Sequence, residues 1–142
     1  MFEAGKERLF MKIPQAMIDE LQYRHEGRPL KQIKESGRIV EVVCELGSDH
    51  AGSWSTALAI IGESAPHFHR KMKEVYLVAR GTLDVHLKTT SSEFIIRLHE
   101  GDHYVIVPFT VHFAEGIDEP AEVLVIATPA WSPEDHVLVE KS

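Results

Sequence analysis

Residues 62–81 read GESAPHFHRKMKEVYLVARG, and this stretch is more informative about fold and chemistry than any other. His67 and His69 lie two residues apart, so on an extended strand both imidazoles point to the same face. Glu74 follows five residues after His69, and a glycine at each end of the stretch indicates a turn. The stretch therefore predicts a strand-rich segment that presents two imidazoles and a carboxylate.

A third imidazole comes from later in the chain. His112 follows a second glycine turn, at Gly101. Three imidazoles and one carboxylate suit a divalent transition metal such as Zn, Fe, Mn, Ni or Co. We therefore expect one such metal, with His67, His69, Glu74 and His112 as its ligands. These four ligands would leave two adjacent positions open on an octahedral ion but would close the site of a tetrahedral zinc.

The spacing of these residues resembles the first sequence motif of the cupins. That motif has a glycine, a short gap, His-x-His, three or four residues, a glutamate, six residues and a second glycine. His67, His69, Glu74 and Gly81 stand in its register, while the gap from Gly62 to His67 is one residue shorter than usual. The resemblance supports the assignment of the three polar side chains as metal ligands.

The second cupin motif is matched less closely. Gly101 and His112 match its two ends. Val107 stands at its usual proline position and Phe109 at its usual glycine position, and Gly116 replaces the asparagine that usually follows the histidine. We expect altered turn chemistry in the loop before His112, with His112 still present as the fourth ligand.

Short β-branched runs between glycine- and proline-containing turns occupy most of the chain after Gly37. The predicted strands cover residues 39–46, 56–61, 75–78, 83–87, 93–98, 104–107 and 122–127, and a hairpin is predicted between 75–78 and 83–87. Many short, closely spaced strands are typical of a sandwich or barrel. The cupin resemblance implies an all-β fold, a double-stranded β-helix or jelly-roll barrel, over residues 37–128.

The two flanking segments differ in character from the barrel. The N-terminal extension, residues 1–36, carries Ile13, Met17, Ile18 and Leu21 at helical spacing, which predicts a short helical segment. The C-terminal tail, residues 129–142, contains two prolines that block regular structure, and its Trp131 needs a surface to cover. We expect this tail to pack on the barrel or on a partner subunit.

The composition limits the partners. A chain of 142 residues suffices for one domain with its own core. The formal net charge is −7 and lysine and arginine do not cluster, so nucleic acid is not an expected partner. No apolar run approaches the length of a membrane span, and the N-terminus lacks the apolar core of a signal peptide. The single cysteine, Cys44, cannot form an internal disulfide, so we expect a cytoplasmic protein.

Four aromatic residues are candidates for the surroundings of the metal. Tyr76 follows Glu74 by two residues and should share its inward face. Its hydroxyl would either act near the metal, as a hydrogen-bond or acid–base group, or be tied to the main chain in the core. The same two alternatives, a role near the metal or packing in the core, apply to Tyr104. Trp54 and Phe109 are expected to wall the mouth of an apolar substrate pocket, with plain packing as the alternative.

Two polar residues complete the candidates. Arg97 would pair with an anionic substrate or else remain a solvated strand residue. His50, in a Gly/Ser loop, is an acid–base candidate because imidazole titrates near neutrality. His25 and His136 have no supporting context, and Cys44 is expected to be a buried strand residue because no local base would activate it.

The ligand set and the cupin resemblance leave three functions open. The one we favour is a metal-dependent, redox-neutral enzyme of isomerase, lyase or cyclase type, which acts on a small oxygenated molecule through metal chelation of its oxygens. The alternatives are an Fe(II) dioxygenase and a non-catalytic metal- or ligand-binding cupin. Fold analogy cannot choose among them, because function depends on the site. The resemblance also implies a homodimer, since exposed strand edges need covering.

Overall fold

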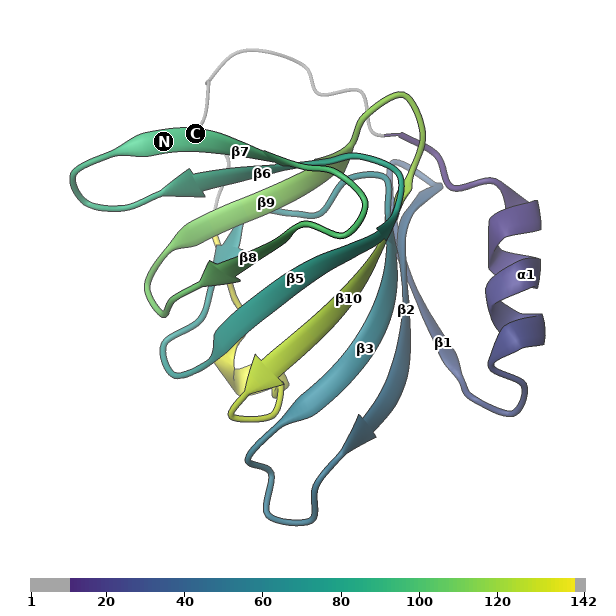
Figure 1. The fold of residues 1–142 in the computed structure, drawn as a ribbon, viewed down its shortest axis with the longest axis horizontal. Coiled ribbons are helices and arrows are strands. Elements are labelled where there is room, and N and C mark those ends of the chain that lie inside the picture. The colour runs from purple at the N-terminus through teal and green to yellow at the C-terminus, as the bar shows by residue number, and fades with distance from the viewer. Residues whose placement is uncertain (1–10, 140–142) are drawn as a thin grey trace.

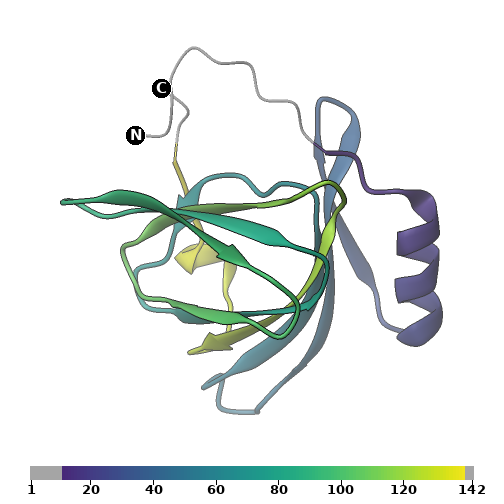
Figure 2. The ribbon, with the colours of Figure 1, turned by 45° about the horizontal axis from the view of Figure 1, so that its top comes forward.

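The computed structural model describes residues 11–139, which form two antiparallel sheets that face each other (Figure 1). Figure 2 shows these sheets enclosing a barrel with the helix outside it, so the predicted all-β jelly-roll barrel is confirmed. The larger sheet has the order β1 (Leu30–Glu35), β2 (Arg38–Ser48), β3 (Ser55–Ile61), β10 (Ala121–Thr128), β5 (Lys73–Arg80) and β8 (His103–Ile106). The smaller has the order β11 (Val137–Leu138), β4 (His67–Phe68), β9 (Val111–Gly116), β6 (Leu83–Lys88) and β7 (Glu93–Leu98).

One predicted connection is wrong. The sequence predicts a hairpin between residues 75–78 and 83–87, but β5 and β6 lie in different sheets. Gly81 has a φ of +86°, and a Cβ atom at this position would lie 3.3 Å from the Cα atom of Ala121. The chain turns from one sheet to the other at Gly81, because glycine allows both this backbone conformation and this close approach.

Four strands are present that the sequence did not predict: β1, β4, β9 and β11. β1 falls within the N-terminal extension and pairs with β2 along its whole length. Its sequence, LKQIKE, is mostly polar because it is an edge strand with exposed side chains. β4 and β11 have two residues each, too few to show an alternating pattern.

Helix α1 (Gln15–Arg24) covers the outer face of the larger sheet (Figure 1). Ile18 and Leu21 lie three residues apart, on one face of the helix, and are buried with Val42 and Ile60 of the sheet. Burial of an aliphatic side chain of this size contributes about 1.5–3 kcal/mol. Cys44 lies in the same cluster and is buried, as predicted. No helix of residues 11–139 is long and apolar enough to cross a membrane.

The barrel interior holds a second apolar cluster, to which both sheets contribute. Its side chains include Val78 of β5 and Leu83 and Val85 of β6, all essentially inaccessible to water. Because side chains alternate along a strand, every second residue of these strands faces inward. Glu74, at the start of β5, lies on the same inward face as Val78 and introduces a charge into this interior.

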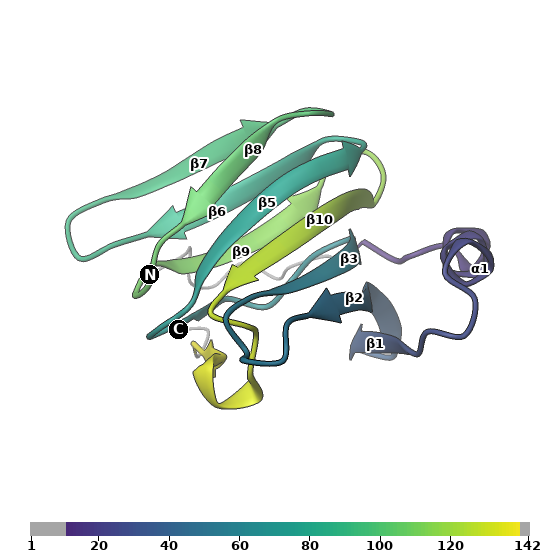
Figure 3. The same ribbon diagram turned by 60° about the horizontal axis from the view of Figure 1, so that its bottom comes forward.

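The tail that follows β10 lies across one end of the barrel (Figure 3). It contains a short 3₁₀ turn, η1 (Pro133–Asp135), and then β11, which pairs with β4. The N–H groups of Ala130 and Trp131 donate to the carbonyl oxygen of Gly52 and the Oγ atom of Ser55, at 2.9 Å each. These contacts fix the tail against the end of the barrel where β4 and the start of β5 lie.

Candidate metal centre

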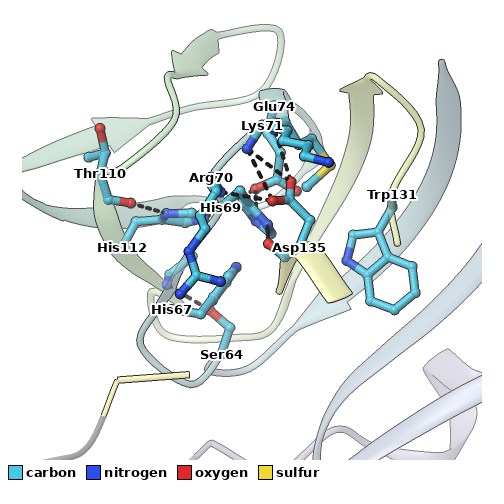
Figure 4. A network of polar contacts seen from close by, with 12 residues as sticks. Ser64, His67, His69, Arg70, Lys71, Glu74, Thr110, His112, Trp131 and Asp135 are labelled. Atoms are coloured by element: carbon cyan, nitrogen blue, oxygen red, sulfur yellow. Dashed lines mark hydrogen bonds and ion pairs between the residues drawn. The ribbon is translucent and has the colours of Figure 1, made fainter. Parts of the chain in front are cut away.

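Four side chains, three from one short stretch of the chain and one from β9, converge inside the barrel: His67, His69, Glu74 and His112 (Figure 4). One ligand atom from each lies within 4.8 Å of the corresponding atom in every other. All four side chains are buried, and His112 is completely inaccessible. The structure thus brings together the four residues that the spacing of the sequence motifs singled out.

The strands explain this convergence. His67 on β4 and His112 on β9 are direct cross-strand partners, so their side chains lie on the same face of the smaller sheet. His69 follows β4 immediately, and Glu74 comes from β5 in the opposite sheet. The site therefore lies between the two sheets and depends on the closure of the barrel.

The hydrogen bonds of the three imidazoles orient them toward a common centre. Each Nδ1 atom donates to a main-chain carbonyl group, so each Nε2 atom carries the lone pair when its ring is neutral and a second N–H group when the ring is protonated. The Nε2 atoms of His69 and His112 lie 3.1 and 3.2 Å from the Oε1 atom of Glu74. A lone pair and a carboxylate oxygen at this distance repel unless a cation, either a proton or a metal, lies between them. The Nδ1 acceptors are the carbonyl oxygens of Ala65, Asp135 and Thr110, at 2.8, 2.8 and 2.9 Å from His67, His69 and His112.

The ionisation of these groups suits a cation. Burial disfavours the charged form of Glu74, but hydrogen bonds from His112 and His69 outweigh it and hold the pKa of this carboxyl well below its usual range. Burial, together with the charges of His112 and His136, lowers the pKa of His67 well below its usual value. Burial also opposes protonation of His69, yet the hydrogen bond with Glu74 prevails and raises its pKa. At this site Glu74 is therefore a carboxylate and His67 is neutral. In the absence of a metal, a proton taken up by the site binds to His69.

The loop between His69 and Glu74 is held by Asp135, a residue that the sequence did not indicate. Its carboxylate accepts hydrogen bonds from the main-chain N–H groups of Arg70, Lys71 and Met72 (Figure 4). Its carbonyl oxygen accepts the hydrogen bond from His69 Nδ1. The tail therefore fixes both the loop and one imidazole, although it lies more than sixty residues away along the chain.

His136 is the second residue of the tail that reaches the site. Its ring stacks on His67, with centroids 4.1 Å apart and planes 17° apart. Trp131 meets His136 edge-on, with centroids 6.1 Å apart. Burial, followed by the charge of His69, lowers the pKa of His136 to about 4, so its ring is neutral at neutral pH. His136 has no supporting context in the sequence, because only the docking of the tail brings it near the other histidines.

Tyr76 also lies at this end of the barrel interior. It is buried, and its ring lies 6.2 Å from that of His112. Burial, with the charges of Glu74 and Glu41, raises its pKa well above the ordinary value, so the phenol keeps its proton. Tyr104 is its cross-strand partner on β8 and is half-buried against the same core.

Phe109 occupies the loop before His112. Its φ is +64°, so the backbone keeps the left-handed conformation that the glycine of the usual cupin motif favours. Its N–H group donates to the carbonyl oxygen of His69 at 2.7 Å. Its ring is 65% exposed and stacks on Phe68, with centroids 6.3 Å apart. The loop is thus tied to the candidate ligands by its main chain.

Three expected site residues make no hydrogen bond or ion pair with the candidate ligands within residues 11–139. Arg97 was expected in the substrate pocket, but its guanidinium donates to both carboxylate oxygens of Asp84, at 2.8 and 3.0 Å. These residues are cross-strand partners on the outer face, because their neighbours in the strands fill the interior. His50 is exposed in the loop between β2 and β3, and no contact within residues 11–139 joins it to the candidate ligands. Trp54 is 43% exposed at the end of that loop, and its main-chain N–H group donates to the Asp49 carboxylate.

Residues 50–138 match the family model of the cupins. The chain belongs to the cupin family. No curated protein sequence matches this cupin. Solved structures do match: the Streptomyces nucleoside dehydratase Pac13 is 15% identical with a TM-score of 0.63, and the match covers 79% of this chain and 86% of Pac13. Bacillus subtilis oxalate decarboxylase OxdC is 15% identical with a TM-score of 0.67, over 80% of this cupin and 30% of OxdC.

A third similar structure is the iron(II) form of HppE, 10% identical with a TM-score of 0.62, over 86% of this cupin and 62% of HppE. Sequence identities this low show only that the fold is shared, so the chemistry has to be inferred from the residues of the site. The relatives include a dehydratase, a decarboxylase and an iron(II) protein, and this cupin has a four-residue group that could hold a metal ion.

Proposed function

We propose that this cupin is a metal-dependent enzyme that acts on a small oxygenated molecule without net oxidation or reduction. The observation that carries the proposal is the orientation of the three imidazoles. All three Nδ1 atoms donate to main-chain carbonyl groups, so the three Nε2 atoms and the Glu74 carboxylate are left as the ligand atoms of one buried group. This donor set fits a divalent transition metal such as Zn, Fe, Mn, Ni or Co.

The chain's own residues set the conditions at this point. Glu74 would offset half the charge of a divalent ion. The neutral imidazoles would not reduce that charge further, so one positive charge would remain to polarise a bound molecule. A metal held by these residues would serve as a Lewis acid for the oxygen atoms and carbonyl group of a bound molecule. Tyr76 keeps a protonated hydroxyl beside the ligands and can donate a hydrogen bond to a bound molecule. Stacked His136 covers one side of His67 and keeps water from that side.

The test of this function is proton exchange. Metal-loaded protein would be incubated in D₂O with a panel of small hydroxyketones, keto acids and hydroxy acids, and loss of carbon-bound hydrogen followed by NMR. We expect exchange with at least one compound, and none with H112A. Oxygen consumption by the iron-loaded protein without such exchange would favour the Fe(II) dioxygenase, for which three imidazoles and a carboxylate are also suitable ligands. Neither activity would favour a non-catalytic binding protein.

A homodimer remains part of the proposal. β7 is an edge strand of the smaller sheet, and it carries Phe94 and Ile95, which are 38% and 57% exposed. Apolar side chains on an open strand edge favour association with a second copy. Light scattering on the eluting protein measures the mass directly, and a monomer at micromolar concentration would rule the dimer out.

A further inference from the structure

The four candidate ligands are closed off from solvent. His67 is the most accessible of them and is only 6% exposed, whereas His112 is completely inaccessible. The strands that carry them belong to hydrogen-bonded sheets, and the apolar cluster of the barrel interior packs around Tyr76, beside His112. A metal ion or a small molecule therefore reaches these side chains only when part of the structure moves away.

The tail, over its described residues 129–139, covers the ligands from one end of the barrel (Figures 3 and 4). The ring of His136 stacks on His67 and meets His69 edge-on, with centroids 4.1 and 5.5 Å apart. The carbonyl oxygen of Asp135 accepts the hydrogen bond from His69, and Leu138 on β11 pairs with His67 on β4. The tail is thus in direct contact with two of the four ligands.

Polar contacts rather than apolar burial hold the tail in place. Asp135 is the only buried residue of the segment 129–139, and none of these residues belongs to either apolar cluster. The main-chain N–H group of Trp131 donates to the Oγ atom of Ser55 at 2.9 Å, and that of Val139 donates to the carbonyl oxygen of Pro66 at 3.0 Å. Hydrogen bonds add little net stability, because water replaces them when they break. Segments with few buried apolar contacts open at a lower cost in free energy than core strands do.

The tail can also leave without dismantling the barrel. β11 pairs with β4 through two residues and is the end strand of the smaller sheet. The loop before His112 lies at the same end, but it joins the paired strands β8 and β9, and its Phe109 is tied to His69. Movement of that loop would displace a ligand, whereas detachment of the tail leaves all four ligands on their own segments.

We propose that residues 129–139 form a gate, which opens to admit a metal ion and a small molecule and closes over the loaded site. Opening lifts His136 off His67 and frees the Nδ1 atom of His69, so both imidazoles become accessible. Closing restores the hydrogen bond from His69 to Asp135, which orients the Nε2 atom of His69 toward the other ligands. The gate rests on the proposed function, because it requires the four ligands to bind a metal.

The test measures how fast the full-length protein takes up cobalt(II) and how fast it loses cobalt(II) to a chelator, both followed by visible absorption. S55A removes the acceptor of the Trp131 N–H group, and Ser55 is not one of the ligands. The open fraction should therefore increase by the same factor with and without metal. We expect both rates to rise about fivefold while the affinity stays the same. S91A is the matched control, since Ser91 is exposed in the turn between β6 and β7, and it should behave as the wild type.

A second variant and a second measurement check that the tail itself has been loosened. W131A removes the cation–π contact with Lys31, whose Nζ atom lies 5.2 Å from the ring centroid, and the edge-on contact with His136. Hydrogen exchange at the N–H group of Val139, measured by NMR, reports the opening of the tail in each protein. Both cobalt rates should increase in proportion to this exchange rate.

The outcomes separate the gate from the proposed function. Faster hydrogen exchange with unchanged cobalt rates would overturn the gate and leave the proposed function standing. Faster loss alone, with weaker affinity, would show that the tail only retains a bound metal, and this would also overturn the gate. Unchanged exchange in both variants would show that these contacts do not hold the tail closed, with the same consequence. A wild type that binds no cobalt would overturn both proposals.

Discussion

Replacing Asp135 with alanine removes the carboxylate that holds the loop between His69 and Glu74. The side chain is 8% exposed and accepts hydrogen bonds of 2.9, 3.0 and 2.9 Å from the N–H groups of three consecutive residues. D135A leaves all three donors without this partner. The bond from Met72 is buried, whereas those from the other two residues are only partly buried, so water can replace the carboxylate there.

The expected cost follows from these exposures. A hydrogen bond to a charged group contributes about 1.5–3 kcal/mol, and a buried donor without a partner costs a similar amount. With one buried and two partly solvated donors, D135A should lower the free energy of unfolding by about 3 kcal/mol. For a chain of this size, that corresponds to a decrease in Tm of about 10 °C. Because the same residue positions His69, metal affinity should fall by about 10–100-fold.

Urea unfolding followed by circular dichroism, with a chelator present, separates the stability effect from metal binding. E134A is the matched control, since Glu134 is the exposed acidic neighbour in the same 3₁₀ turn. D135N keeps one acceptor oxygen and should lie between D135A and the wild type. If D135A unfolds with the same free energy as E134A, the carboxylate does not hold the loop, and this reasoning is refuted.

Three further predictions concern the site and its frame. H67A and H112A should lose bound metal while circular dichroism shows a folded barrel, and the exposed H99A should keep it; full metal occupancy in H67A or H112A would contradict the ligand assignment. G116A should destabilise the fold by about 3 kcal/mol or more, because the added Cβ atom would lie 2.4 Å from the carbonyl oxygen of Glu119 and 2.9 Å from that of Ile61; a change in unfolding free energy below about 1 kcal/mol would show that the turn adapts. Metal affinity should fall as the pH decreases through the raised pKa of His69, since the metal must displace its proton, by up to about tenfold per pH unit. Calorimetric titrations check this last point, and an affinity independent of pH over that interval would argue against His69 as a ligand.

The sequence identified the four candidate ligands because a local pattern carries them. His67, His69 and Glu74 lie on one short stretch, and His112 has its own glycine turn. The hairpin prediction failed because sheet membership is not local. β5 pairs with β10 and β8, so nothing near Gly81 in the sequence shows that β6 joins the other sheet.

The residues that the sequence missed all depend on distant contacts. Asp135 and His136 reach the site only because the tail docks across the end of the barrel. Conversely, the sequence alone left Arg97 available for a substrate, because its pairing with Asp84 depends on the register of two adjacent strands.

Metal content is the property on which the whole account depends. Protein purified without a histidine tag or chelator would be analysed by mass spectrometry, and the coordination of its metal by X-ray absorption. We expect one divalent transition metal per chain, bound by three imidazole nitrogens, one carboxylate oxygen and at least one further oxygen ligand in an open position. A protein that binds no metal after loading, or one that holds a closed four-coordinate zinc, would contradict the proposed enzyme.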